Sequence, residues 1–481
     1  MIKNFKWLVL VSLTFLACTN DEDTTGGEIP VSSGSANFSK YVALGDSFAA
    51  GFSDNALFRK GQENSYPNLL SQQFALAGGG TFTTPFMAAD NVGGFSSGGV
   101  QATSPRLYLD SSSGTPTPTP VPGVSANTLS ERLTGTFNNM GIPGAKSFHL
   151  TFSGYAGANP YFGRFASSTT ATVLGDAIAQ NPTFFSLWIG GNDELGYATN
   201  GGVPTSQDAV NGNDLTPTAT FTAVYNAMAA QLSTGGRKGV LANLPYVTAL
   251  PYFTAVPYNA VPLTAAVATQ LNSGYAQYNA GLALAQSYGL ITAAEKAKRT
   301  IVFAAGQNAV VIVDSYLTNL ISLGLPSYRQ TTSADLLVLP SRSFIGTTVN
   351  GNAAQVNGIS VPLADKWVLS SDEVAEVKAA TDSYNTVIEA AATANGLAFV
   401  DAKSVMTQLS PSGTGIVFNT YTMTSTYVTG GAFSLDGVHP SARGYALITN
   451  LFVAAINAKY GSTLKKADGR DFGILYPKVV N

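Results

Sequence analysis

The sequence contains very little cysteine, histidine and charge, and each shortage excludes a class of protein. Cys18 is the only cysteine among 481 residues, so an intramolecular disulfide cannot form. The two histidines, His149 and His439, lie far apart in the sequence, and with a single cysteine they provide no zinc-ligand spacing. We therefore predict no metal site, and we expect no cofactor.

Charged residues make up 11% of the chain, against roughly 25% in an average soluble domain. The net charge of -3 provides neither a basic surface for nucleic acid nor a polybasic face for an anionic bilayer. Apolar residues make up 45% of the chain, which is enough for a large core. We predict a folded protein with a sparsely charged surface and no nucleic-acid partner.

The first 18 residues have the pattern of an export signal. Two lysines precede an apolar run, residues 7–17, which is too short to span a membrane and has the proportions of a signal peptide. The run ends directly before Cys18, and residues 15–18 resemble a bacterial lipoprotein signal, in which cleavage before the cysteine is coupled to its lipidation. We predict a signal peptide over 1–17 and lipidation of Cys18; the alternative is a cleaved signal followed by an incidental cysteine.

Residues 18–37 are small, polar and rich in Gly and Ser, which predicts a flexible tether. The tether contains an acidic run, residues 21–23, that resembles a surface-export signal of one group of Gram-negative bacteria. We therefore expect an exported lipoprotein of the outer membrane or cell surface, held to the membrane through Cys18.

From Phe38 onward, short β-branched or aromatic runs alternate with longer Ala-rich runs, which indicates βαβ units and a parallel sheet. The runs predicted as strands are 41–44, 183–189, 239–243, 310–313 and 397–400. Each is nearly continuously apolar, as expected for strands that helices cover on both faces. The runs predicted as helices are 66–77, 222–232, 265–288, 371–395 and 441–460.

Three segments between these elements are rich in Gly, Thr and Pro or are irregular: 78–122, 201–220 and 322–361. Loops of this length are usually lids, binding loops or disorder, and the sequence leaves these alternatives open. No linker separates two self-sufficient halves. We predict one α/β domain over 38–461 with long loop insertions, followed by a C-terminal tail over 462–481.

A serine stands where a predicted strand ends. The strand 41–44 runs directly into Gly45-Asp46-Ser47 and then a turn of small residues. The carboxyl ends of strands are where α/β sheets bind ligands, so Ser47 is a candidate nucleophile. Taken alone, the same tripeptide is more often an ordinary turn and helix cap.

A carboxylate and an imidazole lie three residues apart near the other end of the chain, at Asp436 and His439. On a helical or turn-like backbone these positions share one side, so Asp436 can accept from Nδ1 of His439 and leave Nε2 free as an acceptor. A general base needs this arrangement. For His149, which lies in a Phe-rich run, we prefer a structural role.

Two further segments could supply hydrogen-bond donors to a developing oxyanion. Asn192 follows Gly190-Gly191 at the end of the strand 183–189, and its amide can donate an N–H there. Gly144 ends a glycine-bearing loop that could present a backbone N–H. For the Gly-Gly-Asn-Asp sequence, the alternative is a plain turn.

These four blocks, in this order, resemble the SGNH hydrolases, also called GDSL esterases. The first block matches as Gly45 to Ser47, with Phe48 where the family usually has Leu. The resemblance implies a three-layer α/β/α sandwich with a flavodoxin-like parallel sheet. It also implies that the chain is a serine esterase acting through an acyl-enzyme.

In such an enzyme Ser47 would be the nucleophile, His439 its base, and Asp436 the group that orients the imidazole. The oxyanion donors would be the Ser47 and Gly144 backbone N–H groups and the Asn192 side chain. Expected substrates are small-molecule, lipid or acylated-glycan esters, and a carbohydrate deacetylase cannot be told from a lipid acyl hydrolase. The oligomeric state stays open.

Two alternatives remain. A non-catalytic surface binding module on the same fold would show a broken set of catalytic residues, whereas here the set is complete. A peptidase-like serine hydrolase would carry a Gly-x-Ser-x-Gly motif, whereas Ser47 stands in Asp-Ser-Phe.

Overall fold

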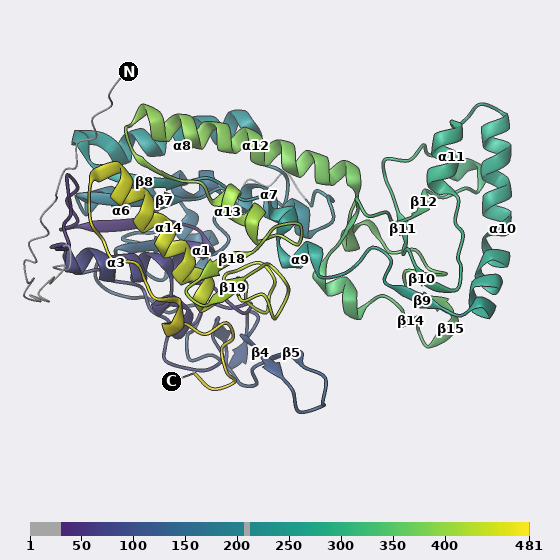
Figure 1. Cartoon of the computed structure of the whole chain (residues 1–481), viewed down its shortest axis with the longest axis horizontal. Coiled ribbons are helices and arrows are strands. Elements are labelled where there is room, and N and C mark those ends of the chain that lie inside the picture. Colours follow the sequence, from purple (N-terminus) through teal and green to yellow (C-terminus); the bar gives the residue numbers. More distant parts are fainter. Residues whose placement is uncertain (1–29, 206–211, 481) are drawn as a thin grey trace, which may run out of the picture. The chain divides into compact units, whose positions relative to one another are not determined.

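The structure is a computed structural model that describes residues 30–205 and 212–480 (Figure 1). The chain divides into two units, residues 1–30 and Val31–Asn481, and the features below belong to the second. The predicted signal peptide, Cys18 and most of the predicted tether lie outside the described residues.

A five-stranded, wholly parallel sheet forms the centre of this unit. In spatial order its strands are β17 (Ala398–Val400), β8 (Lys238–Ala242), β7 (Phe184–Trp188), β1 (Tyr41–Gly45) and β6 (Asn139–Gly141). Counted along the chain this is the order 2-1-3-4-5 of flavodoxin-like sheets, and the order reverses between β1 and β7. The predicted fold class is therefore confirmed.

Helices cover both faces of the sheet, as Figure 1 shows. The pair α8 (Thr218–Ser233) and α12 (Ser371–Ala394) packs on one face, and α3 (Tyr66–Leu76) packs with α14 (Ala442–Tyr460) on the other. All five residues of β1 and of β7 are buried between these layers. In the described parts of the chain, no helix combines the length and apolar character needed to cross a membrane.

Most of the remaining elements are short. The helices are α1 (Ser47–Ala50), α2 (Arg59–Glu63), α4 (Tyr155–Ala158), α5 (Pro160–Gly163), α6 (Val173–Ala179), α7 (Asn192–Thr199), α9 (Pro251–Thr254) and α13 (Ala402–Leu409). The antiparallel pairs are β2 (Ser96–Ser97) with β3 (Val100–Gln101), β4 (Leu107–Asp110) with β5 (Thr117–Pro120), β9 (Val261–Leu263) with β10 (Gly306–Asn308), β13 (Leu336–Leu337) with β16 (Val368–Leu369), β14 (Thr348–Val349) with β15 (Asn352–Val356), and β18 (Ile416–Phe418) with β19 (Tyr421–Met423).

One predicted strand of the central sheet lies elsewhere. In residues 310–313, β11 (Val311–Val313) pairs antiparallel with β12 (Tyr328–Gln330). Val310 and Ile312 pack in a separate apolar cluster with Val256 and Leu363. The prediction is wrong because a short apolar run has the same pattern in any buried strand, whichever core it enters.

Residues 255–364 form an insertion with apolar clusters of its own. It contains β11, β12 and the helices α10 (Ala265–Ser287) and α11 (Ala293–Arg299). The helix predicted over 265–288 is thus confirmed, but its buried side chains pack within the insertion. The irregular segment predicted over 322–361 is only the second half of this larger insertion.

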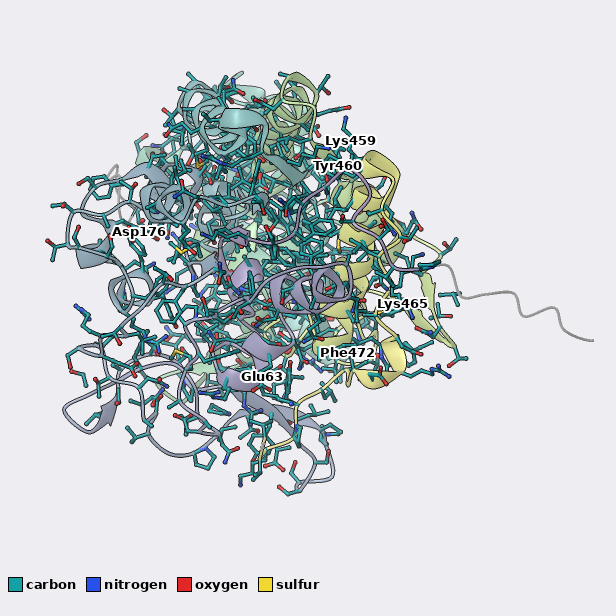
Figure 2. The ribbon with its side chains drawn as sticks, turned by 90° about the vertical axis from the view of Figure 1, so that its left-hand side faces the viewer. Glu63, Asp176, Lys459, Tyr460, Lys465 and Phe472 are labelled. Atoms are coloured by element: carbon teal, nitrogen blue, oxygen red, sulfur yellow. The ribbon has the colours of Figure 1, made fainter. Side chains whose placement is uncertain are left out.

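Segments near both ends of the described chain pack against α14. Figure 2 shows Lys465 and Phe472 beside the helix whose last residue is Tyr460. The Asn450 side chain donates to the Ala467 carbonyl at 2.9 Å and accepts from the Ala467 N–H at 2.7 Å. Residues 464–473 of the predicted C-terminal tail therefore run along α14, whereas Lys478 and Val480 bond to Arg106 and Asn91.

Residues 31–37, which sequence analysis places in the flexible tether, are also packed. The Ser35 N–H donates to the Tyr460 carbonyl at 2.8 Å, and the Thr463 N–H donates to the Ser32 carbonyl at 3.0 Å. Ala36 is buried in the main core. The tether boundary is wrong here because a Gly/Ser-rich composition does not prevent the backbone from bonding to a neighbouring chain end.

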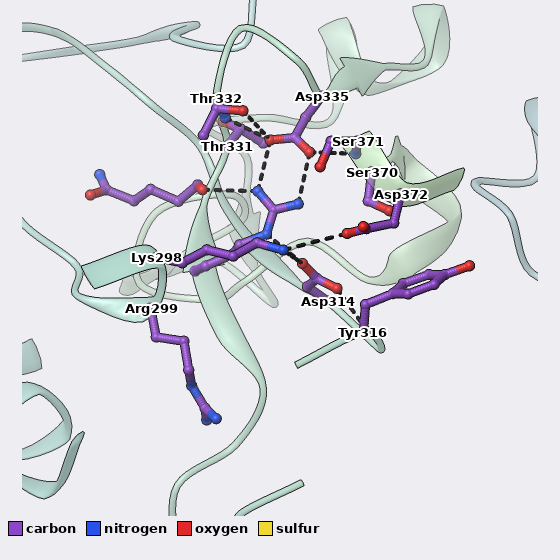
Figure 3. Close-up of polar contacts among 12 residues, drawn as sticks. Lys298, Arg299, Asp314, Tyr316, Thr331, Thr332, Asp335, Ser370, Ser371 and Asp372 are labelled. Atoms are coloured by element: carbon purple, nitrogen blue, oxygen red, sulfur yellow. Dashed lines mark hydrogen bonds and ion pairs between the residues drawn. The ribbon is translucent and has the colours of Figure 1, made fainter. Parts of the chain in front are cut away.

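A buried ion cluster joins the insertion to the start of α12 (Figure 3). Arg329 of β12 donates from Nη1 and Nη2 to the two carboxylate oxygens of Asp335, each at 2.7 Å, and from Nε to Asp314 at 2.5 Å. All three side chains are almost fully buried. The N–H of Ser371, the first residue of α12, donates to Asp335 at 2.9 Å. Lys298 lies 3.4 Å from Asp314.

Asp335→Asn is expected to lower the free energy of unfolding by about 3 kcal/mol, because it leaves the buried Arg329 guanidinium short of one charge partner. Urea unfolding measures the change. The matched control is Glu63→Gln, which breaks the exposed 3.2 Å pair with Lys60 and should cost less than about 1 kcal/mol. Equal effects of the two substitutions would mean that the cluster does not hold the insertion.

Candidate active site

A sharp turn at the carboxyl end of β1 presents Ser47. The Asp46 side chain caps α1 by accepting from the Phe48 N–H at 2.9 Å. Burial raises the pKa of Asp46 to about 7, against the opposing effect of this hydrogen bond. Gly45 is needed before the turn, because a Cβ there would lie 2.5 Å from the Trp188 carbonyl oxygen. Because Ser47 follows β1, it stands beside the point between β1 and β7 where the strand order reverses.

The structure brings together the three residues predicted as nucleophile, base and orienting carboxylate. Nε2 of His439 lies 2.9 Å from Oγ of Ser47, which is 392 positions away in the sequence. Nδ1 of His439 lies 2.8 Å from Oδ2 of Asp436. With the proton on Nδ1, the imidazole donates to the carboxylate and Nε2 accepts from the serine hydroxyl.

Five donors surround the Asp436 carboxylate. Besides Nδ1 of His439, they are the Asn55, Val438 and His439 N–H groups, each at 2.9 Å, and Oγ of Ser434 at 3.0 Å. Burial alone would raise the pKa of Asp436, but the adjacent imidazole and the hydrogen bonds from His439 and Val438 outweigh it and hold the pKa at about 2. Asp436 is therefore ionised under ordinary conditions and can stabilise a protonated imidazole.

A tight turn lets one carboxylate receive so many bonds. Gly437, between Asp436 and Val438, has φ +74°, and a Cβ there would come within 3.0 Å of the Tyr252 backbone nitrogen. A side chain at this position would both strain the backbone and collide with α9. The spacing of carboxylate and imidazole thus depends on this glycine.

Sequence reasoning missed the loop that supports this turn. Asp54 accepts from the Leu435 N–H at 2.9 Å, and its own N–H donates to Oγ of Ser434 at 2.9 Å. Asp54 and Asn55 have φ of 49° and 71°, values that Asp and Asn adopt more readily than most residues. Their occurrence together shortly after Ser47 is the signal that could have predicted a turn here.

Aromatic side chains flank the imidazole. The ring centroids of Phe52 and Phe48 lie 4.5 and 5.6 Å from that of His439. The Tyr445 hydroxyl of α14 donates to the Phe52 carbonyl at 2.7 Å. These contacts limit the rotation of the ring and shield it from water.

Asn192 and Asp193, at the start of α7, hold the loop that follows β6. The Asn192 amide donates to the Ala145 carbonyl at 3.0 Å. The buried Asp193 carboxylate accepts from the N–H and the hydroxyl of Ser147, both at 2.7 Å. Burial raises the pKa of Asp193 to about 6, against these two hydrogen bonds. A primary amide has two N–H groups, so Asn192 has a second donor beyond the one to Ala145.

A cavity of about 40 Å³ opens beside the nucleophile, and we call it the catalytic cavity. Ser47 and Asn192 both line it. Gly144 is exposed and is not among the described residues that line the catalytic cavity. Gly144 directly precedes Ala145, whose carbonyl accepts a hydrogen bond from the Asn192 amide. The structure thus brings Ser47 and Asn192 together, and it places Gly144 next to the segment that Asn192 anchors.

The remaining candidates lie apart from this arrangement. His149 is buried, accepts from the Lys146 N–H through Nδ1 at 3.0 Å, and stacks on Tyr155 with 4.4 Å between ring centroids. Cys18 lies outside the described residues. Within the described ranges, no group of three or more His, Cys, Asp or Glu side chains could hold a metal ion.

No protein-family model matches the chain, and no curated protein matches it. One solved structure that aligns with it is a mutant acetyl-xylooligosaccharide esterase from Geobacillus, with 10% sequence identity, coverage of 88% of this chain and 95% of that chain, and a TM-score of 0.32. Another is an extracellular lipase from Streptomyces rimosus, with 12% identity, coverage of 86% and 98%, and a TM-score of 0.30. At these TM-scores only part of the backbones superimpose, so the chemistry of this chain must follow from its own residues.

Proposed function

We propose that the protein is a serine esterase of the SGNH type, which hydrolyses carboxylic esters through an acyl-enzyme. The supporting observation is the continuous hydrogen-bonded series of Ser47, His439 and Asp436 at the carboxyl edge of the sheet. A non-catalytic surface module would gain nothing from a buried, ionised carboxylate beside an imidazole. The arrangement is typical of an enzyme that activates a serine hydroxyl.

In the first step, Oγ of Ser47 attacks the ester carbonyl carbon while its proton passes to Nε2 of His439. The carbonyl π electrons move to the oxygen, which becomes an oxyanion. Asp436 remains ionised and stabilises the protonated imidazole. The bond to the alcohol oxygen then breaks, and His439 returns the proton to that oxygen as the alcohol leaves.

The acyl-enzyme is hydrolysed by the same groups in reverse. Water gives a proton to Nε2 of His439 and attacks the acyl carbon, and the bond to Oγ of Ser47 breaks as that oxygen regains a proton. The proposed oxyanion donors are the Ser47 and Gly144 N–H groups and the Asn192 amide. For Asn192, support comes from its place in the catalytic cavity beside Ser47.

Ser47→Ala and His439→Ala are each expected to reduce ester hydrolysis by about 10⁴-fold or more while the protein stays folded, because each removes part of the nucleophile and base pair. A panel of nitrophenyl esters and acetylated glycans measures the activity, and circular dichroism measures the folding. Ser383→Ala is the matched control, since the hydroxyl of this serine donates to the Ala379 carbonyl of its own helix, α12. Near-native turnover by either active-site variant would rule out this assignment.

Asn192→Ala is expected to lower kcat by roughly 10² to 10³, with little change in KM, if the amide donates to the oxyanion. The contact with Ala145 is lost in the same variant, so the melting temperature must be measured as well. Asn159→Ala is the matched control, because Asn159 donates to the Pro143 carbonyl of the same loop at 2.9 Å. Similar kcat losses in both variants would show that Asn192 acts only by holding the loop.

We also propose that the protein is an exported lipoprotein of the outer membrane or cell surface, anchored through Cys18. The proposal rests on residues 1–18 of the sequence. In a bacterial host that processes lipoproteins, Cys18→Ser should move the protein from the detergent phase to the aqueous phase, because each buried acyl methylene contributes about 0.8 kcal/mol to membrane binding. Unchanged partitioning would exclude the anchor and leave the esterase proposal intact.

A further inference from the structure

A groove of about 940 Å³ lies between the insertion and the rest of the unit, and we call it the insertion groove. Segments that are far apart in the sequence line it, and several of the elements they belong to are labelled in Figure 1. The lining includes Pro116 beside β5, Thr254 at the end of α9, Gln307 of β10, Arg342 of the insertion, and Tyr427 of the loop after β19. Pockets of about 300–1,000 Å³ hold drug-sized ligands, which have about the bulk of a trisaccharide. The groove is therefore large enough for an oligosaccharide.

The insertion groove adjoins the turn that carries the catalytic carboxylate. The Tyr427 hydroxyl donates to the Leu435 carbonyl at 2.6 Å. The N–H of Tyr252, two residues before Thr254, donates to the Gly437 carbonyl at 2.9 Å. None of the described residues lines both this groove and the catalytic cavity. A ligand in the groove is therefore held beside the active site, but at a site of its own.

Two lining residues are in states that a folded protein normally avoids. Ser425 is 1% exposed, and its buried Oγ has no hydrogen-bond partner among the described residues. An unpaired buried hydroxyl is costly, and a ligand oxygen in the groove can accept from it. Val428 has φ +68°, which is rare for a β-branched residue, and strained positions of this kind cluster at ligand sites. Both observations indicate a site built for a ligand.

The polar side chains of the groove define the charge of that ligand. Arg342 is exposed and forms no hydrogen bond or ion pair with another described residue. None of the described residues that line the groove is Asp or Glu. A guanidinium pairs best with a planar carboxylate or with a sulfate or phosphate group. The side-chain amides of Asn259 and Gln307 add donors and acceptors suited to hydroxyl groups.

The rest of the lining favours a glycan over a peptide. Extended peptides are recognised largely through main-chain hydrogen bonds to a sheet edge, and Gln307 alone among the described lining residues lies in a strand. Pro116, Pro257 and Pro411 are exposed and have no N–H to donate. Their rigid apolar rings can instead pack against the C–H faces of sugar rings, while the neighbouring amides and hydroxyls bond to the sugar oxygens.

We propose that the insertion groove is a second, non-catalytic binding site for an acidic oligosaccharide. Arg342 pairs with a carboxylate or sulfate group of the sugar, and the Ser425 hydroxyl donates to one of its oxygens. The bound glycan lies beside the active site and takes no part in ester hydrolysis. The inference does not depend on the esterase proposal, because the two cavities share no described lining residue.

The test is calorimetric titration of the full-length protein with four probes: trigalacturonate, a sulfated trisaccharide, neutral maltotriose and triglutamate. We expect at least one acidic trisaccharide to bind about tenfold or more tightly than maltotriose, because its anion forms charge-assisted hydrogen bonds with Arg342. The tighter of the two acidic sugars identifies the anion as carboxylate or sulfate. Equal binding of maltotriose, tighter binding of triglutamate, or no binding of any probe would overturn the inference.

Two substitutions locate the site. Arg342→Gln should weaken binding of the acidic trisaccharide by about tenfold or more, because it removes the charge. Ser425→Ala should weaken binding by about fivefold without lowering the melting temperature, because no described residue accepts from this hydroxyl. Arg132→Gln is the matched control, since Arg132 is also exposed and is not among the described residues that line the groove.

The same affinity in Arg342→Gln as in Arg132→Gln would place the ligand elsewhere and overturn the inference. A fall in melting temperature in Ser425→Ala with no loss of affinity would show that this hydroxyl serves the fold, and would equally count against the site. Should Ser425→Ala not fold, Arg342→Gln still decides, because it changes an exposed side chain.

Discussion

The negative charge buried on Asp436 is the constraint on which the rest of the site depends. A carboxylate away from water is costly unless hydrogen bonds replace the lost hydration. Here five donors do so, and the imidazole of His439 is one of them. The charge in turn orients the imidazole of His439 so that Nε2 faces Ser47. The hydrogen bond between Nδ1 and Asp436 thus both stabilises the carboxylate and positions the imidazole.

This requirement explains why distant parts of the chain must meet at one edge of the sheet. The loop at Asp54 and Asn55 follows the nucleophile and bonds to the turn that carries Asp436. Tyr445 of α14 donates to the backbone carbonyl of Phe52, whose ring lies beside the imidazole of His439. The parallel sheet brings the ends of β1 and β7 together, and the turn that carries Asp436 and His439 leads directly into α14. A change in the register of any of these elements would separate groups that now lie within hydrogen-bonding distance.

Much of the fold was predictable because its signals are local. Four of the five strands of the central sheet, and every predicted helix, follow from continuous apolar runs and Ala-rich periodic runs that neighbouring residues alone define. The strand β6 (Asn139–Gly141) was not predictable as a strand, since Met140 is its only large apolar residue, whereas the equally short β17 lies in a continuous apolar run. Residues 310–313 were assigned to the wrong sheet because an apolar run has the same pattern whether it is buried in the central core or in that of the insertion. The packing of residues 31–37 was not predicted, because their Gly- and Ser-rich composition is typical of flexible segments.

The sequence by itself determined which groups are available for chemistry: Ser47 after a strand, a carboxylate three residues before His439, and Asn192 after two glycines. Only the tertiary structure decided that Ser47 and His439 meet, because 392 positions separate them and no local pattern encodes that distance. It also decided that Asp436 is buried and that its carboxylate accepts from the Asn55 N–H, which lies 381 positions away in the sequence.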